Sequence, residues 1–448
     1  MRSSYDLIVI GTGTAAIVAV DRIHAAGWRI AVIDFRPFGG TCALRGCDPK
    51  KVMVGGARAV DLAGRMQDKG VTGDTGIDWR DLISFKRTFT DPVPRKQEQW
   101  YAEKGIDTWH GTARFVGPTS LEVNGKRLEA RHVLIAAGAE PVRLGIPGEE
   151  HLIANEDFLG LDKLPHRIAL VGGGYIAAEF SNIAAIAGAE VTVFQRGERM
   201  LKRFDADLVA WLKEAFDAHG INVRSRTSVE RIEETATGYN VHVSSNGQTD
   251  IAEVNLVIHA AGRAPALNDL DLDAAGIETK KGRLRLNEFL QSTSNPAVYA
   301  AGDAAQMGPP LTPVSSHDAK VVAANLLEGN HRKPDYRGVP SVAFSLPPIA
   351  AVGLTEQQAK EHGLKFRIKS RKASDWFTAR QAAQPTYGFK VLVEEDTDRV
   401  LGAHLVGPYA DDVINLFALA IRHGLTAEDL KTTMFAYPTA ASDIGYML

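Results

Sequence analysis

Two segments of the sequence carry the same pattern of a short apolar strand, a glycine-rich turn and a helix. The first runs from the apolar stretch Asp6–Ile10 into Gly11-Thr-Gly13-Thr-Ala-Ala16, and the second from Arg167–Val171 into Gly172-Gly-Gly174-Tyr-Ile-Ala177. Two glycines at this spacing let the backbone approach a pyrophosphate at a helix N-terminus, and the third small residue lets the helix pack closely on its strand. The pattern therefore predicts an α/β chain with two nucleotide-binding βαβ units.

The end of the second strand differs between the two units. In the first unit the strand Arg29–Ile33 is followed by Asp34, whose carboxylate can accept hydrogen bonds from a ribose. The matching position of the second unit is Gln195, and the basic residues Arg196 and Lys202 follow it. Since a carboxylate repels a 2′-phosphate and an arginine accommodates one, we expect a 2′-phosphorylated nucleotide at the second unit. A solvated basic loop is the alternative interpretation of these charges.

Cys42 and Cys47 are the only two cysteines of the 448 residues, and they follow the first unit directly. A regular helix would hold residues five apart roughly 8 to 9 Å from each other, whereas a disulfide needs Cα atoms about 4.4–6.8 Å apart. We therefore expect a distorted segment, in which a disulfide would be easy to reduce. The alternative interpretation is that the two cysteines are small, buried apolar side chains without a redox role. The flanking Gly39-Gly40-Thr41 and Pro-Lys50-Lys51 favour a redox pair.

These motifs resemble those of the pyridine nucleotide-disulfide oxidoreductases, the flavoprotein family of glutathione reductase, dihydrolipoamide dehydrogenase and mercuric reductase. The resemblance extends over nearly the whole chain. It implies FAD at the first unit and NADPH, in preference to NADH, at the second. It also implies an electron path from the nicotinamide through the flavin to a Cys42–Cys47 disulfide, with Cys47 beside the flavin and Cys42 exchanging with the substrate.

The same resemblance assigns further residues to the site. Lys50 would approach the flavin and pair with Glu179, and Tyr175 would be the gate residue over the flavin. The remaining residues implied at FAD are Thr41, Ala113, Gly138, Gly302 and Asp303, and the residue implied beside NADPH is Gly262.

The resemblance also divides the chain. It implies an FAD-binding domain in two parts, residues 1–145 and 264–337, an NADPH-binding domain at residues 146–263, and a dimerisation domain at residues 338–448. The expected fold class is thus α/β, with two Rossmann-like three-layer nucleotide-binding domains and an α+β C-terminal domain.

The sequence departs from the family pattern near its C-terminal end. Disulfide-reducing relatives carry a histidine and a glutamate where this chain has Tyr437 and Ser442, and Asp443 is one position late to replace the glutamate. A free phenol titrates near pH 10 and an imidazole near pH 6.5, each to about one unit, so tyrosine is a poor general base at neutral pH. We expect a homodimer in which Tyr437 reaches across the interface as a hydrogen-bond or proton donor.

Overall composition limits the possible partners. A net charge of −3 does not indicate nucleic acid or a membrane surface as the main partner, and no apolar run approaches the roughly 18 residues that span a bilayer. The chain enters a strand almost at once, which leaves no room for a leader and predicts a cytoplasmic protein. A redox-cycling disulfide is natural there.

The leading functional hypothesis is an NADPH-dependent FAD enzyme that reduces a small-molecule disulfide or another soft electrophile. A mercuric or other soft-metal reductase is an alternative, although the two cysteines named leave none for the terminal pair that mercuric reductase uses. An NADPH:quinone or oxygen oxidoreductase and a non-catalytic redox sensor are further alternatives.

Overall fold

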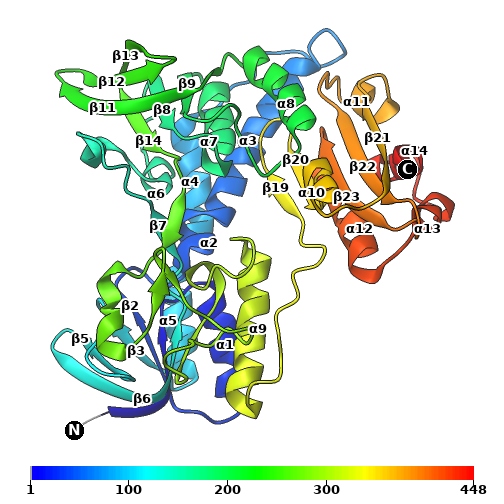
Figure 1. The fold of residues 1–448 in the computed structure, drawn as a ribbon. Helices are drawn as coiled ribbons and strands as arrows, with labels where there is room; N and C mark the ends of the chain where they lie inside the picture. Colours follow the sequence, from blue (N-terminus) through cyan, green and yellow to red (C-terminus); the bar gives the residue numbers. More distant parts are fainter. Residues whose placement is uncertain (1–2) are drawn as a thin grey trace. The chain divides into compact units, whose positions relative to one another are not determined.

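A computed structural model describes residues 3–448, which form two compact units (Figure 1). The first unit comprises the chain up to Lys50 together with residues 85–142 and 263–336, and the second comprises residues 51–84, 143–262 and 337–448. Helix α3 (Cys47–Arg65) begins in the first unit and continues in the second. The division of the chain into four domain segments stays a prediction.

The first unit is built on a seven-stranded sheet. Its parallel centre consists of β1 (Ser3–Ile10), β2 (Ile30–Asp34), β3 (Asp107–His110), β6 (Lys126–Ile135) and β18 (Val298–Ala300). The short strands β4 (Arg114–Phe115) and β5 (Ser120–Val123) continue it in antiparallel pairing beside β6. Strands β2 and β18 and the C-terminal ends of β1 and β6 are buried apolar runs because both faces of a parallel sheet are covered.

Two helices of this unit pack side by side against the sheet. They are α1 (Thr14–His24) and α9 (Thr312–Glu328), which contact each other along their lengths (Figure 1). Helix α1 begins where β1 ends, so its N-terminus and the carboxyl ends of the strands meet at one edge of the sheet. Ligands of open α/β sheets bind at this edge.

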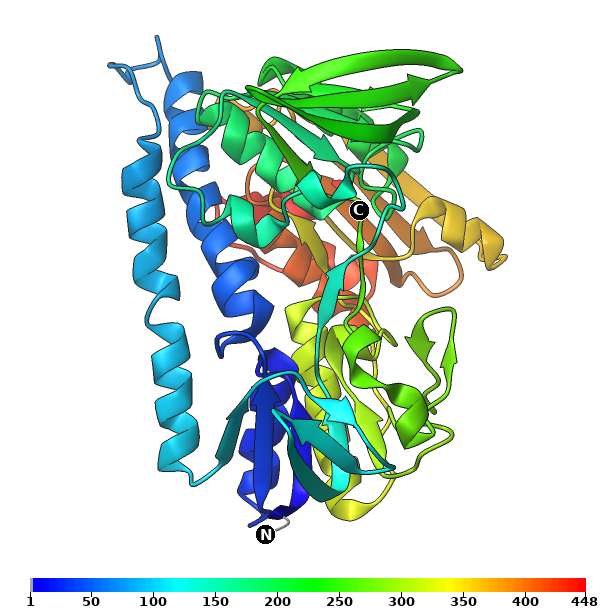
Figure 2. The same cartoon turned by 90° about the vertical axis from the view of Figure 1, so that its left-hand side faces the viewer.

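The second unit contains the second βαβ pattern. Strands β8 (Arg167–Val171), β9 (Glu190–Gln195), β10 (Asn222–Ser225) and β14 (Leu256–His259) form a parallel sheet in the order β10-β9-β8-β14. Helices α7 (Tyr175–Ile186) and α8 (Ala206–Ala218) follow β8 and β9. An antiparallel ribbon of β11 (Thr227–Thr235), β12 (Gly238–Ser245) and β13 (Gln248–Val254) extends from this sheet (Figure 2).

The C-terminal part of this unit is a five-stranded antiparallel sheet. Its order is β19 (Ser341–Ala343), β20 (Ile349–Gly353), β23 (Val400–Val406), β22 (Gly388–Glu394) and β21 (Phe366–Lys372), and helix α12 (Ala410–His423) packs on it. The expected fold class, two nucleotide-binding α/β regions and a C-terminal α+β region, is confirmed.

A buried cation joins this sheet to α8. The ammonium of Lys390, on β22, donates to Asp205 at 3.0 Å, to Asp207, and to Glu356 at 3.3 Å. Lys390 and Asp205 are buried, and Asp205 also caps α8 by accepting from the Asp207 amide at 3.0 Å. A buried ammonium needs such partners because desolvation of an unpaired charge is costly.

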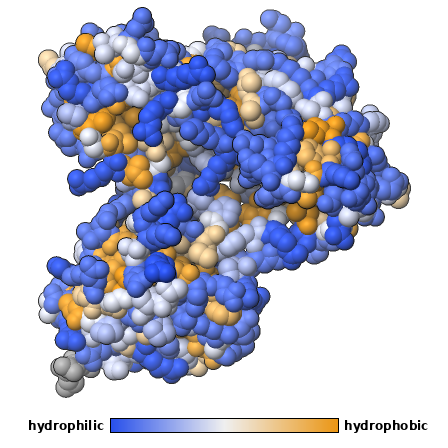
Figure 3. Space-filling view, viewed as in Figure 1, coloured by the Kyte–Doolittle hydropathy of each residue, from blue (hydrophilic) through white to orange (hydrophobic). Residues whose placement is uncertain are grey.

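Hydrophilic residues cover most of the face shown in Figure 3, with apolar patches between them. Among residues 3–448, no helix is both long and apolar enough to cross a bilayer.

Candidate functional site

The first glycine fingerprint is a tightly packed turn. Gly11 has a φ of +104°, and a Cβ at this position would lie 2.3 Å from the carbonyl oxygen of Ala136. Gly40, which immediately precedes Thr41 and Cys42, has a φ of +68°, and its Cβ would lie 2.3 Å from the Cα of Gly13. The cysteine segment therefore rests directly on the fingerprint, which only glycine permits.

Asp34 stabilises the same turn through hydrogen bonds. Its Oδ2 accepts from the Thr12 amide at 3.0 Å and from the Thr12 hydroxyl at 2.6 Å, and its Oδ1 accepts from the Arg36 amide at 3.0 Å. An ionised carboxylate offers about four lone-pair positions, so a further hydrogen bond can still be accepted. Thr12, which lies inside the glycine fingerprint, and Arg36, two positions after Asp34, were not predicted.

One cavity brings most of the residues predicted for FAD together. It is lined by Gly11, Gly13, Asp34, Thr41, Ala113, Gly138 and Asp303, and also by Cys42 and Cys47. Two predicted residues, Ala16 and Gly302, do not line it. Ala16 is fully buried where α1 packs, and Gly302 donates its amide to Asp318 at 3.2 Å.

Two acidic groups near this cavity have raised pKa values. Burial raises the pKa of Asp303, although the Arg263 guanidinium opposes the shift. Burial also raises the pKa of Asp318 to about 6, although hydrogen bonds from the Tyr336 hydroxyl, at 2.8 Å, and the Gly302 amide oppose the shift. Sequence analysis did not find Asp318, because one aspartate on a helix carries no motif.

The helix is interrupted between Cys42 and Cys47, where we expected a distorted segment. Helix α2 (Gly40–Arg45) ends at Gly46, which has φ −144° and ψ −105°, and α3 starts at the next residue, Cys47. Cys42 and Cys47 form no disulfide in the structure.

The two sulfurs share a hydrogen-bonding environment. The side chains of Cys42 and Cys47 hydrogen-bond to each other, and the Thr312 hydroxyl lies 3.2 Å from each Sγ. The bond from Cys42 lowers the pKa of Cys47 to about 6, with Thr312 and Lys50 acting in the same direction against burial. The same bond, together with burial, raises the pKa of Cys42. These shifts favour the negative charge on Cys47 and the thiol proton on Cys42.

The second glycine fingerprint repeats the geometry of the first. Gly172 has a φ of +109°, and its Cβ would lie 2.3 Å from the carbonyl oxygen of Ala260. Gly174 caps α7, whose first turn contains the buried Ala177. Gly262, with a φ of +119°, follows β14.

The basic residues after β9 have different surroundings. Arg196 and Lys202 are exposed, whereas the Arg199 guanidinium donates to backbone carbonyls of Leu201 and Phe204, at 3.2 and 2.9 Å. The first two are thus available to a ligand, while Arg199 holds its own loop together.

Glu179 and Tyr175 lie about one turn apart on α7. Glu179 is buried and accepts from the Phe344 amide at 3.0 Å. Burial raises the pKa of Tyr175, whose ring packs edge-on against Phe204 at 5.5 Å. Lys50 is buried in the first unit, and its pairing with Glu179 stays a prediction.

Ser442 and Asp443, near the position of the family's glutamate, form hydrogen bonds with other groups of the same chain. Asp443 accepts from the Tyr387 hydroxyl at 2.7 Å, and Ser442 donates to the Thr439 carbonyl at 2.6 Å. Tyr437 instead has 82% of its surface exposed. Ser442 and Asp443 thus each have a hydrogen-bond partner within the chain.

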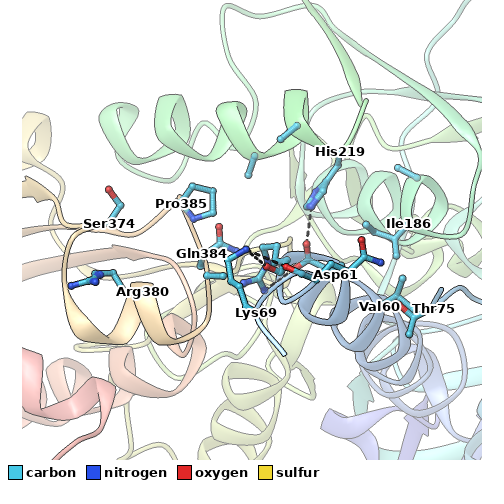
Figure 4. A pocket seen from close by; sticks show the side chains of 17 residues that line it. Val60, Asp61, Lys69, Thr75, Ile186, His219, Ser374, Arg380, Gln384 and Pro385 are labelled. Carbon is cyan, nitrogen blue, oxygen red and sulfur yellow. Dashed lines mark hydrogen bonds and ion pairs between the residues drawn. The ribbon is translucent and has the colours of Figure 1, made fainter. Parts of the chain in front are cut away.

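A second cavity, of about 830 Å³, lies within the second unit and contains none of the predicted residues (Figure 4). Asp61 at its base accepts from His219 at 3.0 Å and from Arg65 at 2.9 Å. Burial opposes ionisation of Asp61, but these two hydrogen bonds hold its pKa below the usual value. We interpret this cluster as structural.

Comparison with known families now identifies the chain. The family model described as pyridine nucleotide-disulphide oxidoreductase matches residues 5–319, and the model of the dimerisation domain of the same family matches residues 339–447. The chain belongs to this family. The family depends on FAD and NAD(P)H, so the predicted resemblance is confirmed, and the C-terminal region is a dimerisation domain.

Individual relatives cover almost the whole chain. A mercuric reductase of Staphylococcus aureus is 35% identical over 98% of this chain and 81% of that protein. A glutathione reductase of a Nostoc species is 32% identical over the full length of both. A Cu(II) complex of a cysteine-to-serine mutant of the HOCl-induced flavoprotein disulfide reductase RclA of Escherichia coli superposes with a TM-score of 0.88, at 27% identity, over 100% of this chain and 99% of that one.

Proposed function

We propose that the protein is an NADPH-dependent FAD oxidoreductase that delivers two electrons to the Cys42–Cys47 pair, which then reduces a small disulfide or another soft electrophile. The observation that carries this proposal is that one cavity is lined both by the first glycine fingerprint and by the two cysteines. We expect the enzyme to act in the cytoplasm, where a cycling disulfide is natural.

The residues of the cavity fit FAD. Gly11 and Gly13 leave the backbone open to a pyrophosphate at the start of α1, Asp34 keeps acceptor capacity for a ribose, and Asp303 would hold the ribityl chain. When bound, FAD supplies the two-electron chemistry that connects a nicotinamide to a disulfide.

The two cysteines have different roles in the reduction of the substrate. In the reduced pair, the negative charge on Cys47 is supported by Thr312 and Lys50, and Cys42 is the thiol that attacks the substrate. A new bond then forms between the sulfur of Cys42 and one substrate sulfur, while the substrate S–S bond breaks and its second sulfur leaves as a thiol with the single proton of the pair. Cys47 next attacks Cys42, which restores the disulfide and releases the other substrate thiolate.

Gln195, Arg196 and Lys202 support a preference for NADPH, because no carboxylate ends β9 and two exposed cations follow it. We expect Arg196→Ala to lower the ratio of kcat/KM for NADPH to that for NADH by roughly tenfold. Arg226→Ala is the matched control, since Arg226 is an exposed arginine paired with Glu198. An unchanged ratio in Arg196→Ala would favour the solvated-loop interpretation.

Tyr437 would complete the site from the partner subunit. Its exposure, and that of Met434 at 98%, on a family dimerisation domain supports a homodimer in which both side chains are covered. We expect Tyr437→Phe to lower turnover while leaving the dimer intact. Full turnover in this variant would show that the phenol has no chemical role.

The central experiment is anaerobic reduction by NADPH followed by a panel of small disulfides, Hg(II), Cu(II) and quinones. We expect disulfide-dependent oxidation of NADPH in the wild type and its loss in Cys42→Ala. A Cys42→Ala variant with full activity toward a quinone or oxygen would contradict the proposed path and favour the quinone alternative. Failure of NADPH to reduce the bound FAD would favour a redox sensor.

Soft-metal reduction is a second candidate. It is favoured by the mercuric reductase among the relatives and by the Cu(II) bound to the similar RclA structure. The metal ion would be the substrate, and NADPH oxidation that depends on Hg(II) or Cu(II) and exceeds the disulfide rate would support this candidate.

A further inference from the structure

The hydroxyl of Thr312 lies between the two sulfurs of the cysteine pair. Its Oγ1 is 3.2 Å from the Sγ of Cys42 and 3.2 Å from the Sγ of Cys47. Thr312 is the first residue of α9, a helix of 17 residues, so its backbone is held by a rigid element. A threonine hydroxyl has one proton, so it can donate to only one of the two sulfurs at a time.

The two hydrogen bonds differ in direction. Toward Cys42 the hydroxyl is the donor, whereas toward Cys47 either the hydroxyl or the thiol can donate. The two cysteine side chains also hydrogen-bond to each other. The same heavy-atom positions therefore fit two arrangements of the protons.

In one arrangement the hydroxyl donates to a Cys47 thiolate, and the Cys42 thiol also donates to that thiolate. In the other, the hydroxyl donates to a Cys42 thiolate, and the Cys47 thiol donates to the hydroxyl oxygen. Each arrangement holds one thiol proton and one negative charge. Conversion between them moves one proton from sulfur to sulfur and rotates the hydroxyl, with no proton gained or lost.

We propose that the Thr312 hydroxyl is the switchable donor that decides which sulfur of the reduced pair carries the negative charge. The inference rests on the proposed function, because the charge matters only if the pair is reduced during turnover. When Cys42 carries the negative charge, its thiolate can attack a substrate. When Cys47 carries the charge, Cys42 is a protonated thiol and does not attack. The thiol proton then stays within the pair, which suits a chain without the family's histidine and glutamate.

The neighbouring charged groups act on the same pair but do not provide this switch. The Lys50 ammonium lowers the pKa of Cys47, and the Asp48 carboxylate raises the pKa of both cysteines. These two groups bias the pair without alternating between its sulfurs. Thr312 contacts both sulfurs and can stabilise a charge on either.

The test compares Thr312→Val with Thr312→Ser in the holoenzyme. The pair is reduced anaerobically, and thiolate absorbance is followed from about pH 5 to about pH 9. Loss of one hydrogen bond to a charged sulfur should raise the titration midpoint by about one pH unit in Thr312→Val, which is a tenfold lower thiolate fraction below the midpoint. The pH profile of kcat/KM for a disulfide should move by the same amount, and Thr312→Ser, which keeps the hydroxyl, should restore both.

A Thr312→Val holoenzyme with the wild-type midpoint and pH profile would overturn the inference. If valine prevents FAD binding, Thr312→Ala removes the hydroxyl with more room and decides by the same criterion. Cys42→Ala separates this inference from the proposed function. Unchanged titration in Thr312→Val, with an inactive Cys42→Ala, refutes the switch alone, whereas an active Cys42→Ala refutes the proposed function.

Discussion

The close contact between the cysteine segment and the first fingerprint can be tested by replacing Gly40 with alanine. The new Cβ would lie 2.3 Å from the Cα of Gly13, and ordinary contact begins at 3.4 Å, so one segment must move by about an ångström. The left-handed conformation of Gly40, at φ +68°, adds about 1–2 kcal/mol for any residue with a Cβ. Overpacking adds about 1–3 kcal/mol, which gives about 2–5 kcal/mol in total.

Part of this destabilisation should appear as weaker binding of FAD. The variant relieves the clash by moving α2 away from the fingerprint, and FAD binding then has to restore the native arrangement of the cavity. A cost of about 2 kcal/mol corresponds to roughly a 30-fold weaker Kd. The assay is FAD titration of the apoprotein, followed by fluorescence, together with urea unfolding.

Gly55→Ala is the matched control for this prediction. Gly55 is exposed within α3, and a Cβ there meets nothing within 4 Å. Alanine is the better helix former by about 1 kcal/mol, so this variant should be as stable as the wild type or more stable, with unchanged FAD affinity. Wild-type FAD affinity and stability in Gly40→Ala would refute the reasoning.

Two further predictions concern ionisable groups. Lys390→Met should lower the free energy of unfolding at pH 7 by about 3–5 kcal/mol, measured in urea, because Asp205 stays buried without its cation. Burial opposes the charge of Lys390, but Asp207 and Asp205 raise its pKa, and hydrogen bonds from Lys360 and Lys390 lower the pKa of Glu356. The difference from the wild type should therefore shrink as the pH falls through the lowered pKa of Glu356, and a difference independent of pH would contradict this. In the reduced protein, thiolate absorbance should rise with pH through a midpoint of about 6, and this rise should be absent from that range in Cys47→Ala. In Cys42→Ala the midpoint should shift upward, because Cys47 loses its main hydrogen bond. A midpoint of about 6 in Cys42→Ala would contradict the assignment of this thiolate.

The local parts of the site were predictable from the sequence. The positive φ angles of Gly11 and Gly172 follow from the glycine spacing, since a turn from strand to helix beside a pyrophosphate excludes a side chain. The break between Cys42 and Cys47 follows in the same way, because a regular helix keeps the two residues too far apart. Such features depend on neighbours in the chain, so a single sequence contains the information.

Other features needed the tertiary structure because their parts are distant in the sequence. The hydroxyl of Thr312 reaches sulfurs that lie 265 and 270 positions earlier in the chain. Asp205 and Lys390 are 185 positions apart. Isolated threonine, aspartate and lysine residues form no motif, and only the packing of helices on sheets brings them to hydrogen-bonding distance. The sequence by itself thus determined the two glycine turns and the break between the cysteines, whereas the folded chain decided which distant groups contact the two sulfurs.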